Sequence, residues 1–314
     1  MEESTCRFVC SRGILGACDI HSENPQSSCH HDTSYLSKLV ETSDMAFHGM
    51  SIYVCSELLS FFVNDILPRL THSFVLVTGD SDLSVPREAL SCEECNKLLS
   101  SPLLLRWFAQ NTSCQLVTIV GEKLVQLPIG LDYHTIARDP HHPWKRPEEG
   151  STPPQQEGIL LSLRHSARPF FAREMKIYVN FSLSNDRFGQ RRDFLRTVPS
   201  FLCAKERTFV RRTDNWKQIT HYAFVASPFG NGMDCHRTWE ALCLGAIPIV
   251  KAPCFRSLFE GLPVLVVNQW SDVTASLLRE TVETFRSASP FPGLEKLELD
   301  YWIRAIRKSK TTTP

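Results

Sequence analysis

One short stretch constrains the fold of this chain of 314 residues more than any other. Residues 221–226 are apolar and run into a loop with two glycines, after which residues 235–244 follow a helical pattern. Gly245 ends that pattern, and a second apolar run begins at residue 247. A strand, a glycine loop, a helix and a second strand in such close succession predict one βαβ unit of a parallel sheet.

The rest of the chain alternates in the same way, which predicts an α/β fold of doubly wound, Rossmann-like parallel sheets. The length of the chain allows two domains of roughly 150 residues each. The polar, proline-rich segment 141–156 is typical of a linker between them. Further strands are predicted at 73–80, 116–120, 123–128, 176–181, 247–250 and 263–267, and helices at 53–67, 95–109, 188–203, 255–260, 273–287 and 294–308.

The loop before residue 235 has the residues of a phosphate-binding site. Gly230 and Gly232 lack a Cβ, so backbone N–H groups and a helix N-terminus are able to approach a phosphate closely. Arg237 on the first helical turn is suited to clamp a diphosphate, and Glu240 is suited to accept hydrogen bonds from ribose hydroxyls. The plainer alternatives are a helix cap for Asp234 and a surface ion pair between Arg237 and Glu240.

This segment resembles a known family. Two strings carry the resemblance, SPFGNGMDCHRTWEALCLGAIPIV at 227–250 and LPVLVVNQWSDV at 262–273. They are similar to the nucleotide-sugar-binding half of exostosin-like glycosyltransferases and their ribitol xylosyltransferase relatives. The resemblance is strong over 222–275 and weaker before it. It implies a GT-B architecture, in which two Rossmann-like domains with parallel sheets face a cleft.

The resemblance also implies how the chain is divided and what it does. Residues 1–35 are expected to form a flexible segment, 36–155 an acceptor-side domain, and 156–314 a donor-binding domain whose final helix crosses back. The implied reaction moves a sugar, with inversion, from a nucleotide-diphosphate sugar such as a UDP-sugar to a hydroxyl of a glycan or glycoprotein. The implied donor-binding residues are Gly230, Asn231, Gly232, Asp234, His236, Arg237 and Glu240.

Position in the sequence suggests two further roles. The general base that deprotonates the acceptor is expected to be Asp82, which follows a predicted strand, or alternatively His134. Arg187 and Arg192 are the arginines expected to reach the diphosphate from between the two halves. No metal or other cofactor is expected, because a guanidinium and a helix dipole are able to stabilise a leaving diphosphate.

Other functions are weighed against this hypothesis. A catalytically inactive relative that binds a nucleotide sugar or a glycan stays open as the alternative. A dehydrogenase is disfavoured, because no G-x-G-x-x-G motif follows an early strand. Cys92 and Cys95 form a single C-x-x-C pair, which lacks the second ligand pair of a structural zinc site.

Charge and hydropathy limit the partners. The 34 basic and 34 acidic residues give a formal net charge of zero, which argues against a non-specific nucleic-acid binder. The apolar runs are shorter than the roughly 18 residues that a membrane span needs, and the first thirty residues lack a signal-peptide core. We therefore expect a soluble chain, cytoplasmic as written, or a Golgi protein if an anchor precedes this sequence.

Overall fold

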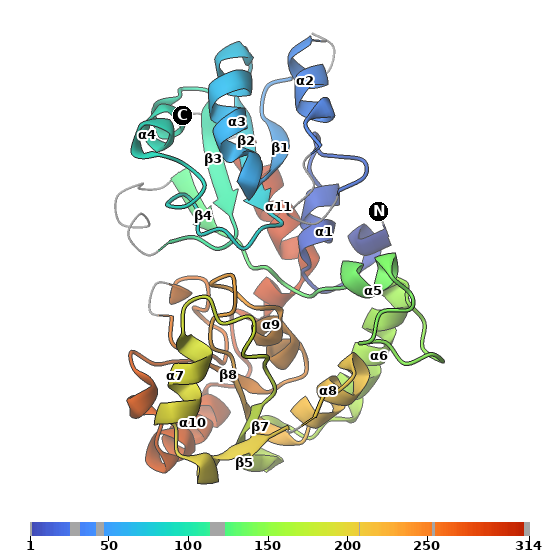
Figure 1. Cartoon of the computed structure of the whole chain (residues 1–314), viewed down its shortest axis with the longest axis vertical. Helices are drawn as coiled ribbons and strands as arrows, with labels where there is room; N and C mark the ends of the chain where they lie inside the picture. The colour runs from blue at the N-terminus through green and yellow to red at the C-terminus, as the bar shows by residue number, and fades with distance from the viewer. Residues whose placement is uncertain are drawn as a thin grey trace.

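The computed structural model describes residues 2–25, 32–41, 47–113, 123–206, 208–252 and 255–310. Within these residues two parallel β-sheets, of four and five strands, lie one above the other with helices around them (Figure 1). We call the part of the chain up to residue 152 the N-terminal half and the remainder the C-terminal half. The prediction of an α/β fold with parallel sheets is confirmed. The strand expected at 116–120 lies outside the described residues.

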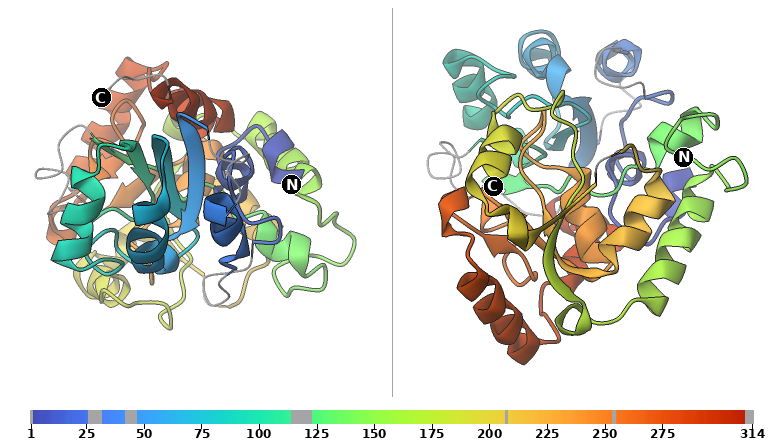
Figure 2. Two further views of the ribbon diagram at one scale, coloured as in Figure 1. Left: turned by 90° about the horizontal axis from the view of Figure 1, so that it is seen from above. Right: turned by 60° about the horizontal axis from the view of Figure 1, so that its bottom comes forward.

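The sheet of the N-terminal half is buried on both faces. Side chains alternate across a strand, so Val75 and Val77 pack in one cluster with Trp302, whereas Phe74 and Leu76 pack in another. Figure 2 shows these strands side by side with helices on either side of them. Their order follows the sequence: β1 (Met50–Cys55), β2 (Phe74–Gly79), β3 (Leu104–Ala109) and β4 (Leu124–Gln126).

Two helices predicted for the N-terminal half are wrong in part. The segment 53–67 begins as the end of β1 and becomes helical only from Ser56, as a series of short helical pieces. The segment 95–109 contains the end of a helix and then β3. Short apolar runs fit a helix or a strand equally well, and pairing with β2 decides for the strand. The helices here are α1 (Ser11–Gly16), α2 (Ser34–Glu41), α3 (Leu59–Phe61), α4 (Cys92–Ser100) and α5 (His134–Arg138).

The sheet of the C-terminal half has the strand order β6-β5-β7-β8-β9. The chain leaves β5 in one direction to form β6 and then crosses to the other side of β5 to form β7. The crevice between β5 and β7 is therefore the topological switch point, where open α/β sheets bind their ligands. The strands are β5 (Glu174–Val179), β6 (Cys203–Lys205), β7 (Tyr222–Ala226), β8 (Ile247–Val250) and β9 (Leu265–Val266).

Three of the helices predicted for the C-terminal half differ in the structure. The helix expected at 188–203 ends at Thr197, because Pro199 disfavours helical backbone at the residue before it. Residues 255–260 form turns rather than a helix, and the segment 294–308 is interrupted at Glu298. The helices are α6 (Pro153–Ser166), α7 (Gln190–Thr197), α8 (Arg212–Ile219), α9 (His236–Cys243), α10 (Ala275–Ala288) and α11 (Leu299–Ser309). Of these, α6 and α8 were not predicted.

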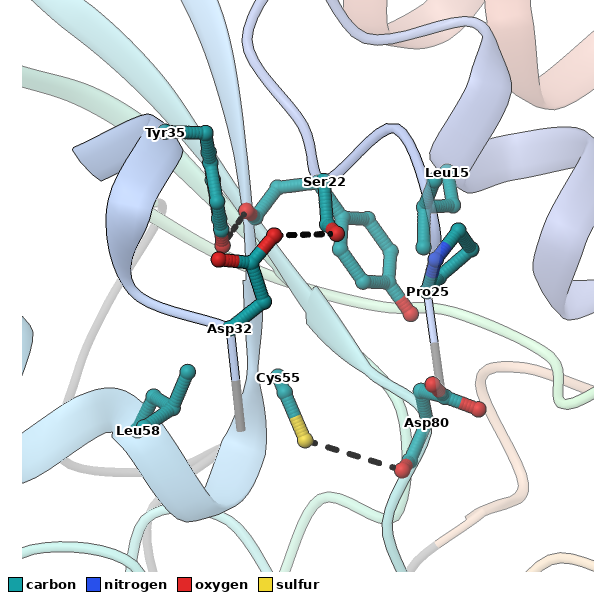
Figure 3. A pocket seen from close by; sticks show the side chains of 9 residues that line it. Leu15, Ser22, Pro25, Asp32, Tyr35, Cys55, Leu58 and Asp80 are labelled. Atoms are coloured by element: carbon teal, nitrogen blue, oxygen red, sulfur yellow. Dashed lines mark hydrogen bonds between the residues drawn. The ribbon is translucent and has the colours of Figure 1, made fainter. Parts of the chain in front are cut away.

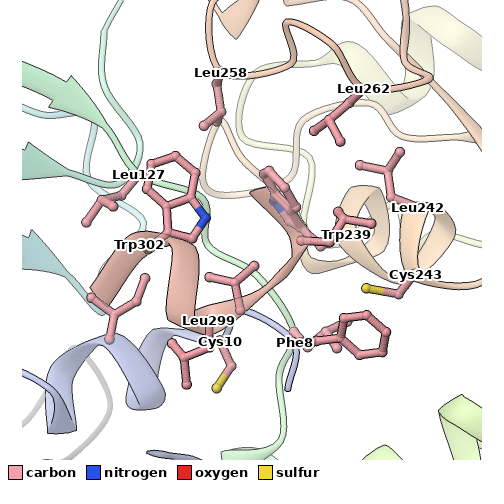
Figure 4. Packing of buried hydrophobic residues seen from close by; sticks show 14 of the residues in the cluster. Phe8, Cys10, Leu127, Trp239, Leu242, Cys243, Leu258, Leu262, Leu299 and Trp302 are labelled. Atoms are coloured by element: carbon pink, nitrogen blue, oxygen red, sulfur yellow. The ribbon is translucent and has the colours of Figure 1, made fainter. Parts of the chain in front are cut away.

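A shared hydrophobic cluster joins the two halves. Trp239 of α9 and Trp302 of α11 belong to it, together with Leu127 from the segment after β4 (Figure 4). The helix α11 contacts α1 and β3, so the end of the chain packs against the N-terminal sheet. Burial of this shared cluster stabilises the packing of the two halves against each other.

The first residues of the chain are packed, so the expectation of a flexible segment is wrong for residues 2–25. Phe8 and Val9 are fully buried in the shared cluster. The backbone N–H groups of Arg7 and Phe8 donate to the carboxylate of Glu157, at 2.8 and 2.9 Å. The N–H of Val9 donates to the carbonyl of Leu297 at 2.8 Å. This segment therefore ties α6 to the start of α11.

Candidate functional site

A cleft of about 560 Å³ opens between the two halves at the carboxyl ends of β5, β6 and β7. The cleft is lined by Val179 at the end of β5, by Lys205 at the end of β6, and by residues 230–232, 234 and 235 of the loop after β7. The cleft thus lies at the switch point of the C-terminal sheet. Its volume is within the range of roughly 300–1,000 Å³ that small-molecule sites occupy.

Arg191 of α7 extends along one wall of the cleft. Its side chain donates to the carbonyl oxygens of Phe229 and Ser182, at 3.2 and 2.6 Å. The guanidinium carbon lies 5.8 Å from the centre of the Phe181 ring. Burial lowers the pKa of Arg191, and the charge of the nearby Arg237 lowers it further. The guanidinium is therefore a largely buried cation that donates to two backbone carbonyls.

Arg237 of α9 lies over the same ring, with its guanidinium carbon 5.6 Å from the centre of Phe181. Nε donates to the carbonyl of Asn180 at 3.2 Å, while Nη1 is buried with no hydrogen-bond partner. In the described part of the chain, neither Arg237 nor Arg191 forms a salt bridge. Two neighbouring cations without a carboxylate are suited to an anion with several oxygens, such as a diphosphate.

The glycine loop lies beside this pair. A Cβ on Gly230 would collide with the guanidinium of Arg191. A Cβ on Gly232 would lie 3.0 Å from Oδ1 of Asp82 and 3.1 Å from the side chain of Asn111. The two glycines therefore allow side chains to approach closely on both sides of the loop. The helix α9 begins directly after it, and the N-terminus of a helix favours a bound anion.

Asp234 fixes this loop to the N-terminal half. Its carboxylate accepts hydrogen bonds from the N–H of Ile129 at 2.8 Å, from the N–H of Cys235 at 2.8 Å and from the indole of Trp239 at 2.9 Å. Its own N–H donates to Oδ1 of Asn111 at 2.8 Å. Burial raises the pKa of Asp234 to about 6. Cys235, rather than Asp234, is the N-cap residue of α9, so the alternative of a side-chain cap is wrong.

His236, Glu240 and Asn231 also line the cleft. The imidazole Nδ1 of His236 lies 2.8 Å from the carbonyl oxygen of Gly130 in the N-terminal half. Glu240 is 9% exposed, and none of the described residues donates a hydrogen bond to its carboxylate. A largely buried carboxylate without a donor is available to hydroxyl groups of a ligand.

Of the two residues expected as general base, the structure brings only Asp82 to the cleft. Asp82 follows β2 and accepts a hydrogen bond from Asn231. His134, the first residue of α5, is outside the cleft lining, and its Nδ1 lies 3.3 Å from Oδ1 of Asp132. Burial lowers the pKa of His134 to about 4, so its imidazole is neutral at pH 7.

Arg187 and Arg192, which were expected to reach the diphosphate, bind carboxylates outside the cleft. Arg187 pairs with Glu88 of the N-terminal half at 2.5 Å, and Arg192 pairs with Asp186 at 3.2 Å. The residue that reaches the cleft from α7 is Arg191. Helical periodicity could have identified Arg191 as the inward-facing arginine, because it shares a face with the buried Phe194 and Val198.

A second, smaller pocket lies at the carboxyl ends of β1 and β2 (Figure 3). Its volume is about 30 Å³, which is room for about one water molecule and excludes a sugar. Asp80 borders this pocket and forms a buried ion pair with Arg12 at 3.0 Å. Burial raises the pKa of Asp80 to about 6, against the opposing charge of Arg12. The carboxylate of Asp80 is therefore engaged with Arg12.

Among the residues that the structure describes, no cluster of three or more His, Cys, Asp or Glu side chains is arranged to hold a metal ion. None of the helices in this part of the chain is both long and apolar enough to cross a membrane. The absence of a metal requirement stays a prediction.

Comparison with protein-family models and with curated proteins finds no match to this chain. The resemblance to exostosin-like glycosyltransferases therefore stays a prediction from the residues at 222–275. What the structure provides is a cleft at a switch point, lined by two cations, a glycine loop and an unpaired carboxylate.

Proposed function

We propose that this chain is a GT-B glycosyltransferase that moves a sugar from a UDP-sugar to a hydroxyl of a glycan or glycoprotein, with inversion and without a metal. The observation that carries the proposal is the pair of guanidiniums, Arg191 and Arg237, beside the glycine loop. Nη1 of Arg237 is buried without a partner, which is costly in the empty protein. A bound diphosphate would supply the missing acceptor.

The rest of the cleft supports the same placement of the donor. Glu240 lies one helical turn after Arg237 on α9, so a diphosphate at Arg237 brings the adjoining ribose within reach of its carboxylate. The sugar then extends from the diphosphate toward the N-terminal half, where Asp82 lines the cleft. As the bond to the sugar breaks, negative charge grows on the diphosphate, and the two guanidiniums stabilise it.

The first test is binding of UDP, GDP and NAD⁺ to the wild-type chain by thermal shift. A ligand that binds the folded state at 100 times its Kd raises the free energy of unfolding by about 2.7 kcal/mol. We expect UDP to raise the melting temperature more than GDP, and NAD⁺ to leave it unchanged. Stabilisation by NAD⁺ alone would refute the proposal.

A second assay separates the enzyme from an inactive binding protein. The wild-type chain is incubated with UDP-glucose, UDP-xylose, UDP-N-acetylglucosamine or UDP-glucuronate, with a mixture of glycan acceptors, and UDP release is measured. We expect release from one donor above the rate of a heat-inactivated control. Tight UDP binding with no release from any donor would identify an inactive nucleotide-sugar binder instead.

A further inference from the structure

His236 has one ring nitrogen assigned by its surroundings. Nδ1 lies 2.8 Å from the carbonyl oxygen of Gly130, and a carbonyl oxygen only accepts hydrogen bonds. Nδ1 therefore carries the proton, and in the neutral imidazole Nε2 carries the lone pair. This carbonyl is itself fixed in place: Gly130 has a φ of 67°, and a Cβ there would collide with the carbonyl of Val9.

The other ring nitrogen is open to the cleft. The ring of His236 lines the cleft, and Nε2 has no hydrogen-bond partner in the described residues. Nε2 is also not among the fully buried atoms that lack a partner. A lone pair is therefore presented to a ligand at the wall of the cleft, at the first residue of α9.

Charged side chains from both halves surround this ring. Four carboxylates lie close enough to interact electrostatically with His236, from the turn after β2, from the segment before α5 and from the glycine loop. The ring of His134 is a further neighbour of this kind. The four carboxylates are those of Asp80, Asp82, Asp132 and Asp234.

We propose that His236 is the general base of the transfer reaction, an inference that rests on the proposed function. Nε2 takes the proton of the acceptor hydroxyl while the hydroxyl oxygen bonds to the anomeric carbon. The bond from that carbon to the diphosphate oxygen breaks, and its electron pair leaves with the diphosphate, whose charge Arg191 and Arg237 neutralise. The proton on Nε2 then passes to solvent.

This assignment differs from both bases expected from the sequence. His134 is outside the cleft lining and is held by Asp132. Asp82 lies against the glycine loop. Its carboxylate accepts a hydrogen bond from Asn231, and its Oδ1 would lie 3.0 Å from a Cβ added to Gly232. Asp82 thus positions the glycine loop.

The experiment uses His236→Asn, because the amide nitrogen of Asn takes the place of Nδ1 and keeps the hydrogen bond to Gly130. We expect UDP to bind within about 3-fold of the wild type, while UDP release falls by about 10²- to 10⁴-fold, the usual effect of a general base. His165→Asn, at an exposed position in the last turn of α6, is the matched control and should change neither quantity. Asp82→Asn tests the rival base.

If His236 is the general base, the rate of UDP release by the wild type should fall at acid pH. The residual rate of His236→Asn should not show this fall. Wild-type release by His236→Asn, with loss in Asp82→Asn, would overturn the inference and leave the proposed function standing. A wild-type chain that fails to bind UDP would overturn the proposed function itself.

A tautomer measurement by nitrogen NMR on the ligand-free protein is independent of any donor. The His236 signals are identified by their loss in His236→Asn. A proton on Nδ1 alone at pH 7.5 supports the inference, and a proton on Nε2 overturns it, whether or not a donor is found.

Discussion

Arg237→Ala is expected to weaken UDP binding while leaving the empty protein as stable as before, or more so. In the ligand-free protein the guanidinium donates a hydrogen bond to the carbonyl of Asn180 and lies over the ring of Phe181. Together these contribute about 1–2 kcal/mol. Against them stand the unpaired buried Nη1, which costs about 1–3 kcal/mol, and repulsion by Arg191. The net change in the free energy of unfolding is therefore within about 1 kcal/mol.

The effect on binding is larger. A hydrogen bond between a guanidinium and a phosphate contributes about 1.5–3 kcal/mol, which corresponds to about 10- to 150-fold in Kd. Calorimetric titration with UDP measures this change. Urea unfolding of the empty protein measures the change in stability, and a melting temperature within about 2 °C of the wild type agrees with it.

Two neighbouring arginines on α7 provide matched comparisons. Arg191→Ala should lose UDP affinity as Arg237→Ala does, and it should also destabilise the empty protein, because the carbonyls of Ser182 and Phe229 lose their donor. Arg192→Ala should change neither, since its exposed side chain pairs with Asp186. Unchanged UDP affinity in Arg237→Ala, or a loss of more than about 3 kcal/mol in stability, would show that the guanidinium is structural.

Three further variants test the groups around this pair. Glu240→Ala should bind UDP and 2′-deoxy-UDP equally, whereas the wild type should prefer UDP by about 10-fold, since a ribose hydroxyl donates to the carboxylate; calorimetry with both nucleotides checks this. Gly230→Ala should reduce UDP affinity about as much as Arg191→Ala, because the added methyl displaces that guanidinium; an affinity equal to the wild type would contradict the geometry. Burial raises the pKa of Asp234 to about 6, so the fold disfavours its ionised form and stability falls as the pH rises from about 4 through about 6. Urea unfolding across this range should show the fall in the wild type, by up to about 3 kcal/mol, and lack this part of it in Asp234→Asn.

Local sequence patterns were sufficient to predict the elements that lie next to one another within one short segment. The strands β7 and β8 and the helix α9 lie within a residue or two of their predicted bounds. The glycine loop, the helix and the next strand are consecutive, and Gly245, with a φ of 74°, ends the unit. No contact with a distant part of the chain is needed to recognise such a unit.

The choice among arginines needed a further step. Arg187, Arg191 and Arg192 follow one another closely, and only the last two lie on α7. The sequence does show that Arg191 is three residues before Phe194 and seven before Val198, which places it on the buried face. Position in the sequence alone favoured Arg187 and Arg192 as ligands of the diphosphate. In the structure both form ion pairs with carboxylates outside the cleft.

The packing of the first residues was beyond any local pattern. Residues 2–25 show no long helical or strand-like period, and their partners are far away in the sequence. The backbone N–H groups of Arg7 and Phe8 donate to Glu157, which lies about 150 residues further along the chain. The backbone of Arg7 and Val9 also bonds to Leu299 and Leu297, about 290 residues further along. Segments whose order comes from such distant partners look flexible in the sequence.

Separation in the sequence also explains why the ring nitrogens of His236 were not assigned from the sequence, since Gly130 lies 106 residues before it. The same contacts show how the site is held in place. The hydrogen bonds from Ile129 to Asp234 and from His236 to Gly130 join α9 and its loop to one short segment of the N-terminal half. The glycine loop and the imidazole of His236 are thus fixed to the same segment, and the carbonyl of Val9 holds that segment by accepting a hydrogen bond from the N–H of Leu131. A site attached in this way is ordered before any ligand arrives, so ligand binding does not have to supply the cost of ordering it. Changes at Val9 or Gly130 should therefore act on the cleft although neither residue lines it.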